Sequence, residues 1–459
     1  MKRFLLVVTV LAVGLAAAYV FFEARRERDY RRFIERGDVA LSSGDTSAAI
    51  EAFSGAIALR ADSMLGYFRR GEAYRRRNEL EPALRDLTRA SELDPTAPRP
   101  LELSGDVNVA LHRYPQAVDR YEASISLDDQ SPRVLYKLGL SRYRMGQPAA
   151  AIAVLRKTVA LNERFPEAHY LLALCLRDGG KSEEAVTSLK RAIDLAPAML
   201  AAVDELAELY ARLGKSEERF DQLERLMALD PSPSRGIALG LAYARHGLVD
   251  RAVPVLRHTA ERFPLDPYVN VALGRVWLEA AQAHDDRVAL GRALEALEGA
   301  VGTDDSSDAL TLFGRALLLA SDDELAERML TQASEQFPVD PLAFYYLAEA
   351  AERQGHFEVA RKALLEYRAL EGEERDALRR GVLAERLADL SFRLDDMPAA
   401  IQWYQRALDA GSSDVPVLLR FAEAQWKAGA VQAARATVAK ALEREPNNAG
   451  ARILQRRLR

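Results

Sequence analysis

The sequence is nearly devoid of cysteine and poor in histidine and aromatic residues. It contains 1 cysteine, Cys175, and 6 histidines, and 7% of its 459 residues are aromatic. One thiol cannot close an intramolecular disulfide, and metal sites need several ligands at defined spacing. We therefore expect no disulfide, no metal and no cofactor. Cys175 lies between two leucines, which favours a buried packing residue, with a reactive thiol as the alternative.

The sequence also lacks the motifs of common catalytic sites. It has no nucleotide-binding glycine loop, no Gly-x-Ser-x-Gly elbow and no His-Glu-x-x-His. The formal net charge is −5, so there is no overall basic excess of the kind that neutralises nucleic-acid phosphates. These absences predict a protein that is not an enzyme and that binds neither nucleic acid nor a small-molecule substrate.

One long hydrophobic run is present, near the N-terminus. A short basic start precedes Phe4–Phe22, which contains no charged residue. As a helix this run would span about 29 Å, the thickness of a bilayer core. Residues 1–22 are therefore predicted to be a transmembrane anchor, followed by a basic linker at 23–29. A cleaved signal peptide is the alternative, since the three alanines at 16–18 suit a signal peptidase.

Two features of the sequence predict opposite orientations for this anchor. More basic residues follow the hydrophobic run than precede it. Under the positive-inside rule this favours a cytoplasmic location for the rest of the chain. A basic start followed directly by an apolar segment is also typical of an export signal, which favours a periplasmic body. The sequence thus predicts a single-pass protein of a bacterial cell membrane and leaves both orientations open. The arginines after the run are Arg25, Arg26, Arg28, Arg31, Arg32 and Arg36.

The rest of the chain repeats one pattern about every 34 residues. In its clearest copy, residues 71–95, small and bulky residues recur at i+3 and i+4 spacing on two successive short helices. The position of Gly71 is always occupied by Gly or Ala, which allows the two helices to approach closely. The equivalent residues are Gly37, Gly71, Gly105, Gly139, Ala173, Ala207, Gly240, Gly274, Gly314, Ala348, Ala388 and Ala422.

Two further features complete the pattern. A bulky residue such as Phe53 or Tyr121 follows sixteen positions after the small one, and a proline ends many copies. The pattern resembles the tetratricopeptide repeat over about residues 30–448, roughly twelve copies. The resemblance implies an all-α, right-handed superhelical solenoid whose first helices line a concave face that binds peptides or protein segments. Residues 449–459 would form a polar capping helix.

Two copies are about six residues longer than the others. The extra residues lie near 281–291 and at 371–380. Insertions in such arrays lengthen helices or loops on one face. We expect the second insertion to divide the array into a first arm of about ten repeats, 30–370, and a second arm, 381–448.

A basic residue recurs at the thirteenth position of seven copies. The family's best-known site, a carboxylate clamp of Lys and Asn at the fifth and ninth positions, is absent from the first five repeats. By resemblance the thirteenth position faces the groove, where arginine could bind an acidic or extended peptide. The alternative is that these cations offset the helix dipole in the last turn. They are Arg76, Arg144, Arg212, Arg245, Arg353, Arg393 and Lys427.

Aromatic and arginine side chains gather in the fourth and fifth repeats. Such residues are typical of interface hot spots, which predicts a partner site in the first half of the array. Packing between repeats is the alternative role for the tyrosines. The residues are Arg133, Tyr136, Tyr143, Tyr170 and Arg177.

The sequence therefore predicts a non-catalytic, membrane-tethered scaffold or adaptor. It would bind protein or peptide partners on its concave surface, in envelope assembly or quality control, and the anchor would hold it near partners at the membrane. The alternative is a regulatory or targeting subunit of an enzyme complex whose catalytic activity lies on another chain.

Overall fold

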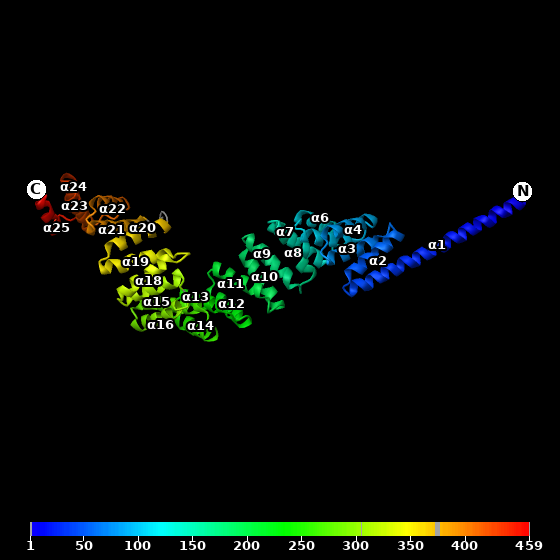
Figure 1. Cartoon of the computed structure of the whole chain (residues 1–459), viewed down its shortest axis with the longest axis horizontal. Helices are drawn as coiled ribbons and strands as arrows, with labels where there is room; N and C mark the ends of the chain where they lie inside the picture. The colour runs from blue at the N-terminus through cyan, green and yellow to red at the C-terminus, as the bar shows by residue number, and fades with distance from the viewer. Residues whose placement is uncertain (1, 304, 372–376, 459) are drawn as a thin grey trace. The chain divides into compact units, whose positions relative to one another are not determined.

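The chain is helical throughout the part that the structure describes. The computed structural model describes residues 2–303, 305–371 and 377–458, and the side chains of all of these except 2–10 and 377–379. Within these ranges there are 25 α-helices and no strand (Figure 1). The all-α prediction is confirmed.

Contacts divide the chain into two compact units, Met1–Leu229 and Asp230–Arg459. In unit 1, the first helices of six repeats are α1 (Lys2–Ser42), α3 (Met64–Arg76), α5 (Pro98–Ala110), α7 (Pro132–Arg144), α9 (Pro166–Asp178) and α11 (Leu200–Arg212). Each packs against the second helix that follows it. The second helices are α2 (Thr46–Leu59), α4 (Leu80–Leu93), α6 (Tyr114–Leu127), α8 (Pro148–Leu161), α10 (Ser182–Leu195) and α12 (Ser216–Leu229).

Unit 2 contains six more helix pairs and a final single helix. Its first helices are α13 (Pro233–Arg245), α15 (Pro267–His284), α17 (Ser307–Leu319), α19 (Pro341–Gln354), α21 (Ala377–Arg393) and α23 (Val415–Lys427). Its second helices are α14 (Val249–Arg262), α16 (Arg287–Val301), α18 (Asp323–Glu335), α20 (Phe357–Glu371), α22 (Met397–Asp409) and α24 (Val431–Arg444). The last helix, α25 (Ala449–Arg457), buries Ala451 and Leu454 against the preceding pair.

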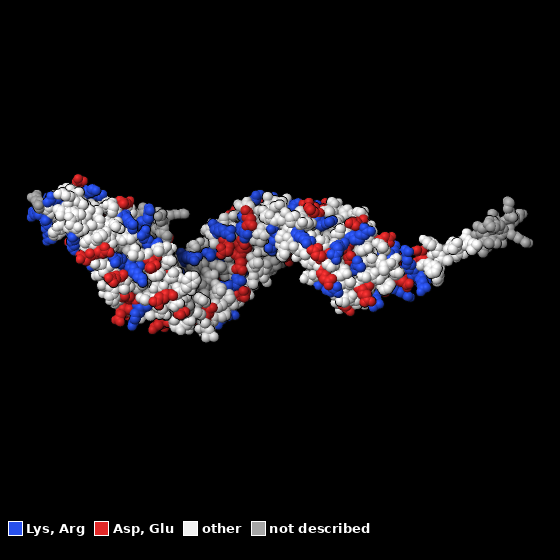
Figure 2. All heavy atoms as spheres, turned by 45° about the horizontal axis from the view of Figure 1, so that its top comes forward, with Lys and Arg blue, Asp and Glu red and all other residues white. Residues whose placement is uncertain are grey.

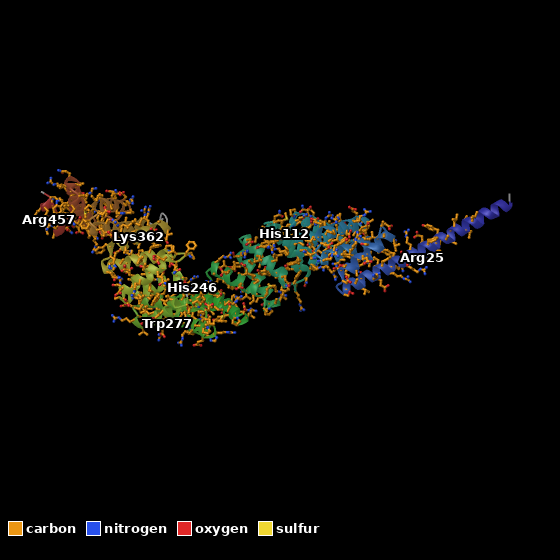
Figure 3. The ribbon with its side chains drawn as sticks, viewed as in Figure 1. Arg25, His112, His246, Trp277, Lys362 and Arg457 are labelled. Carbon is orange, nitrogen blue, oxygen red and sulfur yellow. The ribbon has the colours of Figure 1, made fainter. Side chains whose placement is uncertain are left out.

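Local sequence explains where these helices begin and turn. Proline occupies the first turn of several first helices, where its missing N–H leaves no bond unmade. Asp45 caps α2 by accepting a hydrogen bond from the Ala48 N–H. The turn inside a repeat needs a left-handed residue, which is Gly146 at φ 71° between α7 and α8. His112 holds the same place between α5 and α6 at φ 58° (Figure 3), so this histidine is a turn residue.

In the repeats whose small residue is glycine, that glycine lies directly against a bulky side chain of the second helix. A Cβ placed on Gly105 would lie 2.4 Å from Tyr121 Cε1, and one placed on Gly314 would lie 2.4 Å from Leu330 Cγ. Tyr121 and Leu330 are buried. At these glycines the expected close approach of the two helices is therefore present, and it depends on the absence of a side chain there.

The two insertions lengthen helices. The first extends α15 to 18 residues, against 13 in most first helices, and the second extends α21 to 17. One core cluster continues across the second insertion, since Leu364 of α20 and Leu387 of α21 belong to it. The structure divides at Leu229/Asp230, and not at 371–380 where the sequence placed the boundary between two arms. Residues 372–376 of that insertion lie outside the described residues.

The first helix runs without a break from Lys2 to Ser42, so residues 23–29, predicted to be a linker, are helical. Tyr30, Ile34 and Leu41 pack it into the first repeat. The predicted anchor falls partly outside the described side chains, which begin at Leu11. In the portion that the structure describes, no helix has the length and apolarity needed to cross a membrane.

Gly314→Val should lower the midpoint of thermal unfolding, because the new side chain must displace Leu330 from the contact that joins α17 and α18. Overpacking of this kind costs about 1–3 kcal/mol. Circular dichroism during heating measures the effect.

The matched control is Gly299→Val in α16, where no heavy atom lies within 4 Å of an added Cβ. We expect this change to stay within about 0.5 kcal/mol. Equal midpoints for the two variants would contradict the proposed role of the close contact.

Candidate functional site

The first helices of unit 1 form a surface joined by side chains from repeat to repeat. Helix α3 contacts α1 and α5, and α7 contacts α9. Ion pairs connect α7 to α5, through Arg133 and Glu102, and α9 to α11, through Arg177 and Glu205. We call the face of α5, α7, α9 and α11 the first-helix surface. It carries all five residues predicted for a partner site in the fourth and fifth repeats.

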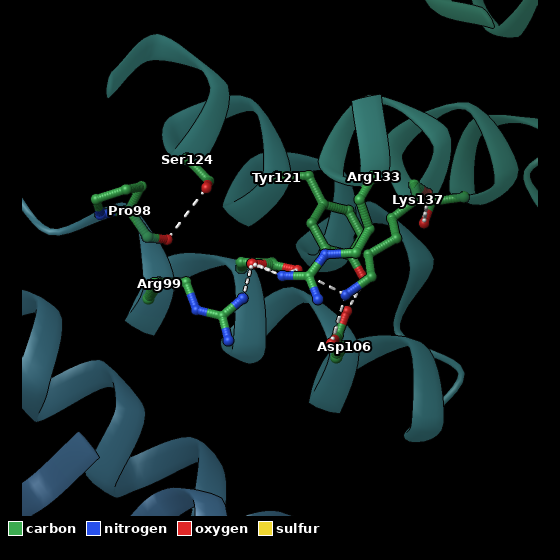
Figure 4. Close-up of polar contacts among 9 residues, drawn as sticks. Pro98, Arg99, Asp106, Tyr121, Ser124, Arg133 and Lys137 are labelled. Carbon is green, nitrogen blue, oxygen red and sulfur yellow. Dashed lines mark hydrogen bonds and ion pairs between the residues drawn. The ribbon is translucent and has the colours of Figure 1, made fainter. Parts of the chain in front are cut away.

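A buried carboxylate lies at one end of this surface. Glu102 is 2% exposed and accepts hydrogen bonds from three cations (Figure 4). The Nζ of Lys137 lies 2.8 Å from its Oε1, and the guanidinium groups of Arg133 and Arg99 lie 2.9 Å from its Oε2. Burying a charge is costly unless it is paired, and here the pairing is threefold.

Asp106 extends the cluster by one helical turn. The same Lys137 Nζ lies 2.7 Å from Asp106 Oδ2, and the Tyr121 hydroxyl donates to Asp106 Oδ1 at 2.7 Å (Figure 4). The cluster therefore joins α5, α6 and α7, and so fixes the third repeat against the fourth. We call Glu102, Asp106, Tyr121 and Lys137 the Glu102 cluster.

The protonation states in this cluster follow from its contacts. Burial raises the pKa of the Glu102 carboxyl, but Lys137, Arg133 and Arg99 together outweigh it and hold that pKa below its ordinary value. Burial and the neighbouring Asp106 raise the pKa of Tyr121. At neutral pH the carboxylate is thus ionised and the phenol is protonated, which suits every hydrogen bond described.

The same four-residue arrangement occurs in unit 2. Tyr404 donates to Asp389 Oδ1 at 2.5 Å, and Arg420 pairs with both Asp389 and, at 3.1 Å, Glu385. Asp389, Tyr404 and Arg420 follow Glu385 by 4, 19 and 35 residues, as Asp106, Tyr121 and Lys137 follow Glu102. Neither cluster was predicted from the sequence, although the shared spacing of its four residues is visible there.

The tyrosines of the first-helix surface are half-buried beside charged groups. Tyr136 packs on Phe165 with ring centroids 5.0 Å apart, and burial, together with the nearby Asp178, raises the pKa of Tyr143. Burial raises the pKa of Tyr136 and of Tyr170. These side chains are held in place by neighbours, yet each keeps part of its ring open to solvent.

Arg133 of α7 and Arg177 of α9 form ion pairs with neighbouring first helices. The guanidinium of Arg177 lies 2.7 Å from Asp178 and 2.6 Å from Glu205. Arg133 pairs with Glu102, but its side chain remains 57% exposed. Arginine thus serves two roles here, since Arg177 ties α9 to α11 while Arg133 keeps donor groups in solvent.

The seven cations of the thirteenth position do not share one environment. Arg76 donates to Leu41 O at 3.1 Å and Arg353 donates to Leu318 O at 2.8 Å, so each caps the C-terminal end of the preceding first helix. These two fit the helix-dipole interpretation.

The other five are all exposed and differ in whether they stack on an aromatic ring. Arg393 stacks on Phe357 and Lys427 on Phe392, at 4.9 and 4.2 Å from the ring centroids. The remaining three are exposed and form no hydrogen bond or ion pair with the described residues: Arg144, Arg212 and Arg245.

Two further features of the described residues are the buried thiol of Cys175 and the arrangement of possible metal ligands. Cys175 is fully buried, and burial raises the pKa of its thiol to about 12. This agrees with a packing role, since only the thiolate is nucleophilic. No group of three or more His, Cys, Asp or Glu residues that could hold a metal ion occurs among the described residues.

Comparison with known proteins shows a single family. The family model described as "Tetratricopeptide repeat" matches residues 34–98, 136–199, 237–308 and 311–374, and a second model with the same description matches 391–458. Together they cover well over half of the sequence.

One curated relative is "Small glutamine-rich tetratricopeptide repeat-containing protein 2" of Mycosarcoma maydis. It is 26% identical over 114 residues, which are 25% of this chain and 32% of the relative. The match thus spans about a third of that protein.

Several solved structures share the helical repeats. YrrB, titled "a TPR protein with an unusual peptide-binding site", is 27% identical and covers 41% of this chain and 96% of its own, with a TM-score of 0.38. MamA from Desulfovibrio magneticus RS-1 is 24% identical and covers 36% and 96%, with a TM-score of 0.35. PilF from Pseudomonas aeruginosa is 19% identical and covers 46% and 96%, with a TM-score of 0.39.

Glu102→Gln should destabilise unit 1 at neutral pH, because it leaves three cations without their shared anion. The expected loss is about 1–3 kcal/mol, measured by urea unfolding. Glu81→Gln is the matched control, since Glu81 pairs with Arg113 at the surface and should contribute under about 1 kcal/mol.

The pH dependence tests the same contact. The pKa of Glu102 is lowered in the folded chain, so its contribution is present above the unfolded carboxyl pKa of about 4.3 and is lost as pH falls through the folded pKa. The stability difference between the wild-type chain and Glu102→Gln should therefore shrink as pH falls below about 4. A difference that stays constant would contradict this account.

Proposed function

We propose, because the chain belongs to the tetratricopeptide repeat family, that it is a non-catalytic scaffold that binds protein or peptide segments on its first-helix surface. Proteins of this family generally act as protein-interaction scaffolds. Binding on the first helices needs no chemistry from the protein. It needs only a surface whose side chains are exposed and already ordered.

The observation that carries this proposal is the arrangement of α7 and α9. Tyr136, Tyr143 and Tyr170 lie half-buried on these two helices, with exposed Arg133 and Arg144 on α7. Tyrosine and arginine are enriched at interface hot spots because they offer large contact areas and several donors. Partial burial already restricts the tyrosines, so a partner would lose little side-chain entropy on binding here.

We further propose that the chain is tethered to a bacterial cell membrane through Phe4–Phe22. Support comes from the described part of this segment, where Leu15, Phe21 and Phe22 are 57–70% exposed although they are apolar. Figure 2 shows this stretch without charged side chains, whereas both signs of charge are mixed over the repeats. An apolar surface of this kind is stabilised by a partner or by lipid. Such a tether would raise the effective concentration of the scaffold for membrane partners.

Replacing Tyr136, Arg144 and Tyr170 with alanine should abolish partner capture by in-cell crosslinking while leaving helicity unchanged. Removing large rings and an exposed guanidinium from one face removes the expected hot spot. The control is Arg191→Ala on α10, an exposed arginine of a second helix. Unaltered capture by the triple variant would overturn the proposed site. A single partner at fixed stoichiometry would indicate the alternative role, a subunit of an enzyme complex.

Membrane tethering predicts that the full chain stays in the membrane fraction after an alkaline carbonate wash. Leu15→Arg should release much of it, since a charge at the centre of a span costs about 2.5–3.5 kcal/mol on insertion scales. Val39→Arg, at an exposed position of α1 inside the first repeat, is the control. Wild-type protein found in the soluble fraction would contradict the tether. A mature N-terminus after residue 18 would identify a signal peptide instead.

A further inference from the structure

A pocket with arginine and tryptophan walls lies in unit 2, between α20, α21 and α22. Its volume is about 630 Å³, within the range of about 300–1,000 Å³ that ligand sites occupy. Its lining includes Leu365 and Arg368 of α20, Arg380 and Leu383 of α21, and Trp403 and Arg406 of α22. We call it the Trp403 pocket.

Two of these arginines are stacked on the tryptophan ring. The guanidinium carbon of Arg368 lies 5.1 Å from the indole centroid of Trp403, and that of Arg406 lies 4.4 Å from it. Stacking orders a guanidinium while leaving its in-plane N–H groups free to donate. The pocket therefore presents two pre-oriented cationic forks beside an aromatic wall.

The three arginines that line the pocket have no acidic partner among the described side chains. Elsewhere in the same unit arginines such as Arg361, Arg386 and Arg420 pair with carboxylates. Arg368, Arg380 and Arg406 form no such ion pair with a described residue. Two acids, Glu371 and Asp409, also line the pocket, but Asp409 accepts its hydrogen bond from Gln405 at 2.8 Å. Among the described lining residues, three cations face two acids, which leaves that lining positive.

The second insertion provides part of this pocket. In the common register of the repeats, the first helix containing Ala388 would begin near residue 381, as α3 begins at Met64 seven residues before Gly71. Helix α21 instead begins at Ala377. The added turn includes Arg380, whose equivalent in the second repeat is Ser63, the residue just before α3.

We propose that the Trp403 pocket binds a short acidic peptide segment of a partner protein, in which an Asp or Glu side chain lies beside a leucine or phenylalanine. The carboxylate would accept from the forks of Arg368 and Arg406, which match its geometry. The apolar side chain would contact Trp403 and the leucines of the wall. The occupant is assigned by charge complementarity. Guanidinium groups that pair with no described carboxylate favour an anion, and the wall favours an apolar group.

This site is separate from the proposed first-helix surface. It lies largely on the second helices α20 and α22 of unit 2, whereas the tyrosines of α7 and α9 belong to unit 1. The two proposals therefore stand or fall independently. A chain with both sites could hold two segments at once.

The test uses the full chain and a fluorescent, end-blocked peptide, Asp-Glu-Leu-Phe-Asp-Glu, with anisotropy as the readout. The matched peptide Asn-Gln-Leu-Phe-Asn-Gln has the same shape without charge. We expect saturable binding of the acidic peptide and at least about tenfold weaker binding of the neutral one. Arg368→Gln and Arg406→Gln should each weaken the acidic peptide by about tenfold.

Two variants separate the pocket from other cationic surface. Lys362→Gln changes an exposed cation of α20 that is not among the pocket-lining residues (Figure 3), and it should bind like the wild-type chain. The triple alanine variant of Tyr136, Arg144 and Tyr170 should also bind normally. Absence of saturable binding, equal binding of the two peptides, or an equal loss in Lys362→Gln would each overturn the proposal. Circular dichroism confirms that each variant remains folded.

Discussion

Every repeat of this chain depends on the close approach of its two helices at one small residue. Where that residue is glycine, as at Gly105 and Gly314, the space of the missing side chain is filled by Tyr121 or Leu330 from the second helix. The contact buries a large side chain between the helices and fixes their separation. Because it uses one side of the first helix for packing, the other positions of that helix are free to carry polar and aromatic groups.

Those free positions join successive repeats. Lys137 reaches back to Glu102 and Asp106, and Arg353 reaches back to the carbonyl group of Leu318. Each interaction spans one repeat, so it forms only when two neighbouring repeats are stacked. The polar contacts therefore specify the register of the stack, while the apolar contacts provide most of its burial. This division allows a surface rich in charge to remain ordered.

The helical repeats were predictable because their signal is local. Gly71, Ala83 and Leu87 lie within sixteen residues of one another, and the same spacing recurs along the chain. The partners of surface residues were harder to predict, since they lie about one repeat away and depend on side-chain direction. Arg76 and Arg144 occupy equivalent positions, yet Arg76 donates to Leu41 O while Arg144 forms no hydrogen bond with a described residue. The pocket at Trp403 was missed because its arginines come from three helices, one of them lengthened by an insertion.

The two four-residue clusters show how one arrangement acquires different electrostatics. Three cations surround Glu102 and Asp106, because Arg99 and Arg133 join Lys137 there.

At the equivalents of Arg99 and Arg133, the second cluster has Val382 and Pro416, both exposed, so Arg420 serves Glu385 and Asp389 alone. The pKa values of the two equivalent glutamates are therefore shifted in opposite directions. The pKa of Glu102 is lowered, whereas burial and the nearby Asp389 raise the pKa of Glu385 despite Arg420. In both clusters one cation joins the two repeats, and the cations present beyond it decide whether the pKa of the buried carboxyl is lowered or raised.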